Sequence, residues 1–321
     1  MEDVDSAVVG IDDQRTRRTP GRTEAGRTVC ACPPLQHRDE VHQQRLTGER
    51  ALFGGKHLHI RECVFADGES PLKHSRDIEI TDSLFEWKYP LWYATDVTID
   101  HSVLATTARA GIWYSDGVTI TNSTIDAPKS FRRTRRVRLD HVDLPRADET
   151  MWNCENVTLD NVSVRGEYFA MNSRNITANG LRVTGGYAFD GTRDVDISNA
   201  TILSKDAFWN SENVTVRDSF IVGEYLGWNA RNLTFINCTI QSLQGLCYID
   251  NLVLRDCRLI DTTLAFEYST VDAGVTTRID SVINPAGGAI RCAGLGELIL
   301  DPSRVDPGRT TIVTAGAPSA V

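Results

Sequence analysis

Five of the six tryptophans in this chain recur at a nearly constant spacing of 19 to 21 residues or at two or three times that spacing, and each has an aromatic or polar neighbour. The segments that carry four of them read YPLWYA, AGIWYS, AFWNSE and YLGWNA. A row of exposed indoles is costly for a monomer and usually marks a binding surface. Sugars present flat apolar faces edged with hydroxyl groups, so the pattern predicts an extended carbohydrate ligand.

The residues in register with these tryptophans define the predicted ligand-binding column. The register also contains Phe53, Met171 and Cys247, whose side chains suggest no polar contact. Its charged members suit an anionic or hydroxylated ligand. The predicted ligand-binding residues are Lys73, Trp92, Trp113, Arg132, Trp152, Asp190, Trp209 and Trp228. The alternative is a structural or self-associating solenoid, a homodimer for example, in which a protein surface covers the tryptophans.

Catalysis is a second alternative, in which the protein is a glycoside hydrolase or a polysaccharide lyase. Hydrolysis of a glycoside needs two carboxyl groups that face one another. Asp190 is the one carboxylate in the column, between Met171 and Trp209, where an apolar setting would raise its pKa. Its candidate partners are Glu167, Glu224 and Glu267, and spacing alone does not choose among them. Asp190 is therefore a weak catalytic candidate, and whether the protein is an enzyme stays open.

The element that must position the column is a repeat. From residue 56 onwards, units such as ENVTLDNVSV, ENVTVRDSFI and RNLTFINCTI recur eleven times, with steps of 19 to 21 residues between their first apolar positions. These positions are Leu58, Ile78, Val97, Val118, Val137, Val157, Ile176, Val195, Val214, Leu233 and Leu252. A constant period in this range indicates a solenoid. The match to a leucine-rich repeat is poor, because Ser211, Ala230 and Ser173 stand where that consensus needs leucine.

Each unit alternates apolar and polar residues, bends at Asn, Asp or Gly, alternates again and ends in an aromatic segment. β-branched and aromatic residues dominate, and no helical period is present. The pattern predicts an all-β, single-stranded parallel β-helix of about eleven to twelve coils, with three short strands per coil. The residue just before the column is apolar or glycine throughout, from Leu52 to Leu246, so we expect it to face the core and the column to face outward.

The repeat also sets the expected boundaries. Residues 1–46 lack the pattern and are expected to be a disordered or non-native extension, because they contain few large apolar residues. Residues 47–300 are expected to form the β-helix with its closing strands, and residues 301–321 a loose tail.

Composition excludes several classes of function. The net charge of −9 and the absence of basic runs argue against nucleic-acid binding. No apolar run approaches the roughly 18 residues of a membrane span. The first residues lack the apolar core of a secretory signal, so a cytoplasmic location is expected. The sequence shows no spacing for a metal site and no cofactor motif, so neither is predicted.

The segments GERALF, DGESPLK, YPLW, DAFWNSENVTV, GEYLGWNARNLT and LAFEYS resemble the repeats of a bacterial β-helix family known only as a domain of unknown function, number 3737. The resemblance covers residues 47 to 300. It implies a right-handed β-helix of the pectate-lyase-like kind. It implies no activity, and no catalytic residue can be transferred from it.

Overall fold

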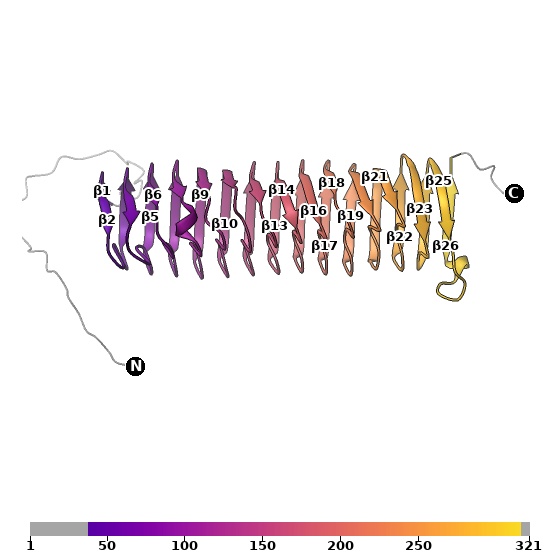
Figure 1. Ribbon diagram of the computed structural model, residues 1–321, viewed down its shortest axis with the longest axis horizontal. Helices are drawn as coiled ribbons and strands as arrows, with labels where there is room; N and C mark the ends of the chain where they lie inside the picture. The colour runs from indigo at the N-terminus through magenta and orange to yellow at the C-terminus, as the bar shows by residue number, and fades with distance from the viewer. Residues whose placement is uncertain (1–37, 316–321) are drawn as a thin grey trace, which may run out of the picture. The chain divides into compact units, whose positions relative to one another are not determined.

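A computed structural model of the chain describes residues 38–315. Within that range the regular structure is 26 β-strands and two 3-10 helices, η1 (Thr106–Ala108) and η2 (Pro307–Arg309). Every strand pairing is parallel, and 24 strands belong to one continuous sheet system. The coils follow one another in sequence order along the solenoid axis, from β1 to β26 (Figure 1).

Most coils contain two strands. The first strands are β1 (Asp39–His42), β3 (Lys56–Arg61), β5 (Arg76–Thr81), β7 (Thr95–Asp100), β11 (Glu155–Asp160), β13 (Arg174–Asn179), β15 (Arg193–Ser198), β17 (Glu212–Arg217) and β19 (Arg231–Ile236). The second strands are β2 (Arg45–Thr47), β4 (Val64–Ala66), β6 (Leu84–Phe85), β8 (Val103–Leu104), β12 (Ser163–Arg165), β14 (Arg182–Gly186), β16 (Thr201–Lys205), β18 (Phe220–Val222) and β20 (Thr239–Leu243).

In three coils the two strands run together, and the last coils are less regular. The continuous strands are β9 (Asp116–Ile125), β10 (Arg135–Leu144) and β21 (Asp250–Thr263). The final strands are β22 (Thr270–Val275), β23 (Arg278–Ile283), β24 (Gly287–Cys292), β25 (Gly294–Ile299) and β26 (Thr310–Thr314). Of these, β23 and β25 form a separate two-stranded sheet.

The register of the sheet confirms the repeat. Each apolar position that marks a unit in the sequence pairs directly with the marker of the next coil, from Leu58 opposite Ile78 to Leu233 opposite Leu252. The alternation within a strand sets the burial, since Val214 and Val216 are fully buried and Thr215 between them is not. The fold is therefore a parallel β-helix.

The expected number of coils, eleven to twelve, is wrong: the solenoid has about 15. One further coil precedes the repeat, where Asp39 pairs with Leu58, and three follow it, through Val271, Gly288 and Thr310. Three of these four coils are hidden in the sequence because Asp39, Gly288 and Thr310 occupy the apolar marker position. In addition, the last two steps are 17 and 22 residues long. Residues 1–37 of the predicted N-terminal extension lie outside the described residues.

The third segment of each coil, which we call the aromatic turn, is not the strand that the sequence predicts. Residues 206–210 form turns, and Asp206, Phe208 and Asn210 have φ values of 57°, 61° and 53°. Backbone hydrogen bonds still join the coils here: the Phe208 amide donates to Ala188 in the preceding coil and the Asn210 amide to Trp228 in the following one, both at 2.9 Å. The coil therefore closes through left-handed residues rather than through a third strand.

The core is an apolar stack inside the coils. The residue before each column member from Lys73 onwards is buried as expected, for example Leu91, Phe131 and Phe208 at 0% exposure, whereas Leu52 near the N-terminal end is only partly buried. Aromatic rings stack between coils, with centroids 4.5 Å apart for Phe65 and Phe85 and 5.3 Å apart for Phe189 and Phe208. Parallel strands that enclose such a core hold each aromatic turn directly above its counterpart in the preceding coil.

Candidate functional site: an aromatic face on the turns

The tryptophans in register on successive turns form what we call the indole column. Trp92 and Trp113 stack with centroids 5.1 Å apart and planes 6° apart. Trp209 and Trp228 repeat this arrangement at 5.6 Å and 8°. All five indoles of the column are half-buried rather than fully exposed. In these two pairs the rings lie flat on one another, so one apolar face of each indole is covered by its partner.

The indole nitrogens have backbone partners. Each Nε1–H donates to a carbonyl oxygen in the following coil, at 2.6 Å for Trp92 to Ala110, 2.7 Å for Trp113 to Lys129 and 3.2 Å for Trp228 to Gln244. Trp152 and Trp209 make the same bond at 2.7 Å, to Tyr168 and Tyr225. These bonds tie each aromatic turn to the next, so the indole column has a structural role whatever it binds.

Two predicted cations also lie in this column. The Arg132 guanidinium lies between two indoles, 4.6 Å from the Trp113 ring centroid and 4.7 Å from that of Trp152. It contacts Glu149 at 3.4 Å. Lys73 Nζ lies 5.8 Å from the Trp92 centroid. A cation over an aromatic face is attracted by the ring quadrupole, so Arg132 continues the stack where the sequence has no indole.

Asp190 lies in the register of the column between Trp152 and Trp209, where two successive coils have Met171 and Asp190 in place of an indole. It is half-buried, and its Oδ1 accepts a hydrogen bond of 2.9 Å from Asn210. The glutamates proposed as its partners make other contacts: Glu224 pairs with Lys205 at 3.4 Å, and Glu267 lies 3.8 Å from Arg304. Among the described residues, no ion pair or hydrogen bond connects Asp190 to a second carboxyl group.

A buried carboxyl group that the sequence analysis missed lies one coil further on. Asp206 is 1% exposed, and its Oδ1 has no hydrogen-bond partner among the described residues. Burial raises the pKa of this carboxyl above its ordinary value, against the opposing effects of Lys205 and of a hydrogen bond from Tyr187. The sequence signal was available, because in four successive coils this register reads Tyr168, Tyr187, Asp206 and Tyr225, so that Asp206 interrupts a local run of tyrosines. At 1% exposure this carboxyl cannot contact a substrate.

A second line of rings, which we call the tyrosine line, follows the indole column one residue later. His74, Tyr93 and Tyr114 stack at centroid distances of 5.0 Å. Tyr93 and Tyr114 are 42% and 38% exposed, more than any indole of the column. Their rings meet those of Trp92 and Trp113 edge to face. Sequence reasoning overlooked this line because only the tryptophans were followed through the repeat.

Neither a metal centre nor a membrane span is found in residues 38–315. No group of three or more His, Cys, Asp or Glu side chains there is placed to hold a metal ion. No helix in the same range has the length and apolar character needed to cross a bilayer.

Several solved structures are similar to this chain at low sequence identity. The A-module of the mannuronan C-5 epimerase AlgE4 of Azotobacter vinelandii is 12% identical, with 88% of this chain and 91% of that chain covered and a TM-score of 0.30. PfbA, a surface adhesin of Streptococcus pneumoniae, is 10% identical over 86% and 84%, with a TM-score of 0.41. Tailspike protein 3 of bacteriophage CBA120 is 12% identical over 88% and 52%, with a TM-score of 0.31. These likenesses concern the fold alone.

A comparison with curated proteins found no match. The sequence profile of one family does match, over residues 39–313, which takes in both the predicted repeat and the end coils that the sequence analysis left out. Its description is a protein of unknown function, DUF3737. The chain belongs to this family.

Proposed function

We propose that the chain binds an extended carbohydrate along the aromatic face, which consists of the indole column and the tyrosine line together. The tyrosine line of the N-terminal coils is the main contact. The observation that carries this proposal is the exposure of Tyr93 and Tyr114, 42% and 38%, beside indoles that are already stacked and hydrogen-bonded. Their ring centroids are 5.0 Å apart along the axis, which is close to the length of one sugar unit in an extended β-linked glycan. Phenol groups offer such a ligand an apolar edge and a hydroxyl.

The backbone conformation of these tyrosines is one that asparagine adopts more readily. Tyr93 and Tyr114 have φ values of 57° and 59°, a region that disfavours bulky side chains and in which Asn is enriched. Other coils of the same register use Asn153, Asn210 and Asn229, with φ between 53° and 57°. Left-handed residues recur throughout the coils, also at the buried Phe131 and Phe208, so this conformation by itself does not mark a functional site. The chain therefore keeps two tyrosines where asparagine folds more easily.

The charges around the tyrosine line favour a hydroxylated or anionic glycan. Lys73 Nζ lies 5.7 Å from the Tyr93 ring centroid, and the Arg133 guanidinium lies 5.9 Å from that of Tyr114. Lys73 belongs to the turn of the coil before Tyr93, and Arg133 to the turn of the coil after Tyr114. Their donors can hydrogen-bond sugar hydroxyls or pair with a carboxylate.

The alternative of self-association predicts that a second copy covers the same face. Catalysis by Asp190 is not favoured, because its described hydrogen bond is to an amide and two facing carboxyl groups are needed. Light scattering, which measures the oligomeric state, distinguishes self-association from glycan binding.

The test replaces Tyr93 and Tyr114 by Asn, which suits their backbone conformation and preserves the fold. We expect an array of extended glycans, followed by calorimetry on the best ligand, to show at least a tenfold loss of affinity. Tyr248→Asn is the matched control, because Tyr248 lies in the same register, has φ of 59° and is 38% exposed, but belongs to a C-terminal coil. Equal losses in control and test variants would refute the assignment. A wild-type dimer that the double variant dissociates would favour self-association instead.

A further inference from the structure

Near the aromatic face, one coil has a residue that differs from the rest of the repeat. This residue is Trp87. In the register four residues before the core residue, the chain otherwise has only small residues: Gly48, Gly68, Ala108, Ala127, Ala147, Gly166, Gly185, Ser204, Gly223, Ser242 and Thr262. Trp87 is 38% exposed. No aromatic ring among residues 38–315 is in ring contact with it, unlike the five tryptophans of the indole column. A large exposed ring in a register of small residues has no packing role in the repeat.

The next coil carries an insertion at the same place. Phe85 pairs with Leu104, but Ile112 follows Leu104 by eight residues whereas Leu91 follows Phe85 by six. The longer connection contains the three-residue turn η1. Thr106 Oγ1 donates to Asp126 Oδ2 and Thr107 Oγ1 to the carbonyl oxygen of Glu86, both at 2.5 Å, so the turn is attached to the coils on either side.

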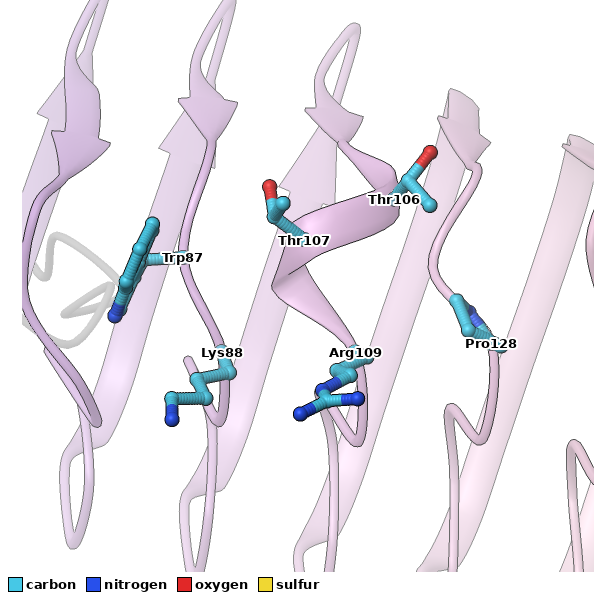
Figure 2. Close-up of a pocket in the computed structure, with 6 residues that line it drawn as sticks. All are labelled: Trp87, Lys88, Thr106, Thr107, Arg109 and Pro128. Atoms are coloured by element: carbon cyan, nitrogen blue, oxygen red, sulfur yellow. The ribbon is translucent and has the colours of Figure 1, made fainter.

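The tryptophan and the insertion enclose a pocket of about 460 Å³, lined by Trp87, Lys88, Thr106, Thr107, Arg109 and Pro128. Figure 2 shows the side chains arranged over three successive coils, with Lys88 and Arg109 side by side. This volume lies within the range of about 300–1,000 Å³ that is typical of small-ligand sites.

The charge in the pocket is positive. Lys88 pairs with Glu69 at 2.5 Å, and that hydrogen bond raises the pKa of Lys88, so it is a cation at neutral pH. Arg109 is exposed and makes no ion pair or side-chain hydrogen bond within the described range. The nearby Asp126 is engaged by Thr106 and by Arg146 at 3.2 Å. Arg109 is therefore the cation of this pocket that has no anionic partner among the described residues.

We propose that this pocket binds one anionic sugar unit, with the apolar face of the sugar on Trp87 and its carboxylate or sulfate on Arg109. The inference deepens the proposed function, because it rests on a glycan as ligand, but it uses none of the residues of the indole column or the tyrosine line. An exposed indole beside two cations and two hydroxyl oxygens matches the chemistry of such a unit: a flat C–H surface, an anionic group and ring hydroxyls. A uronate and a sulfated sugar share this chemistry.

The experiment uses the full chain labelled with 5-fluorotryptophan, which gives one fluorine signal for each of its six tryptophans. A Trp87→Ala variant assigns the signal of the pocket and uses the residue type found at Ala108 and Ala127 in the same register. The probes are tetragalacturonate, a chondroitin sulfate tetrasaccharide and neutral maltotetraose. We expect one of the anionic probes to shift the Trp87 signal, and the neutral probe to leave it unchanged at the same concentration.

The variant Arg109→Gln should reduce the affinity for that anionic probe at least tenfold, while Arg165→Gln, at an exposed position on a distant coil, should not. An unshifted Trp87 signal with both anionic probes overturns the inference. A shift confined to Trp92 and Trp113 also overturns it but supports binding on the aromatic face. A shift of Trp87 that persists when Tyr93 and Tyr114 are replaced by Asn supports the pocket as a separate site, and an unchanged affinity of that variant for the anionic probe argues against the tyrosine line.

Discussion

The indole column contains the same stacked pair twice, and the residues that follow the two pairs differ. Trp92 with Trp113 and Trp209 with Trp228 have nearly the same ring geometry and the same Nε1–H bonds to backbone carbonyl oxygens. The next residue is tyrosine in the first pair and asparagine in the second. All four of these residues have φ between 53° and 59°.

This comparison distinguishes the indoles, which the solenoid needs for its structure, from the following residues, to which we assign the proposed ligand contact. Because the indoles are alike in both halves, their geometry follows from the needs of the solenoid. The following residue is free to vary, and asparagine is the choice that suits the left-handed backbone. Tyrosine in the N-terminal pair stands where the left-handed backbone favours asparagine and exposes a ring, so it is the residue to which we assign the proposed glycan contact. Cations accompany the tyrosines, through Lys73 and Arg133.

The largest expected effect tests whether the two indole pairs are equivalent. Trp113→Ala and Trp209→Ala should each lower the free energy of unfolding by about 3 kcal/mol, since each removes a stacked ring and leaves a backbone carbonyl without its donor. Urea denaturation followed by circular dichroism measures both. If one variant loses less than a third of what the other loses, the two pairs do not share a structural role.

A smaller effect tests the difference in the following residue. Asn210→Tyr places a bulky side chain at φ of 53° and should destabilise the protein by about 1 kcal/mol. The reverse change, Tyr93→Asn, should alter stability by less than about 0.5 kcal/mol, because relief of the backbone offsets the lost ring contact. The same denaturation assay applies. A clear loss of stability in Tyr93→Asn would show that the tyrosine line is structural.

The smallest effect concerns Asp206, which lies in the C-terminal half among tyrosines. Because burial raises its pKa in the folded chain, the ionised carboxyl disfavours folding. That penalty is absent below the ordinary value of 3.8 and grows as the pH rises through the folded-state pKa. Asp206→Asn should therefore raise the melting temperature more at pH 7 than at pH 4.

Asp190→Asn is the control for this pH dependence, because Asp190 is half-buried and its carboxylate already accepts a hydrogen bond from Asn210. Thermal denaturation at several pH values measures both variants. A gain for Asp206→Asn that is independent of pH would mean that the burial of the charge is not its cause.

The sequence by itself determined the repeat, the sheet register and the inward side of each coil. In a solenoid each coil contacts only its neighbours, so residues 19 to 21 apart in the sequence are neighbours in space, and Val214 opposite Leu233 follows from counting. The core position of Phe208 follows in the same way, because no polar residue enters its register. The same reasoning failed at the ends, where Asp39 and Gly288 occupy the marker position without an apolar side chain.

Only the tertiary structure decided how the outer residues are arranged. Whether a turn runs as a strand or through left-handed residues changes the direction of every side chain on it, and the residue pattern is compatible with both. The bond from Trp209 to the carbonyl of Tyr225 joins residues 16 apart, out of phase with the repeat, so no register reveals it. The burial of Asp206 and the pocket beside Trp87 depend likewise on three coils packed together, a property that periodicity alone does not contain.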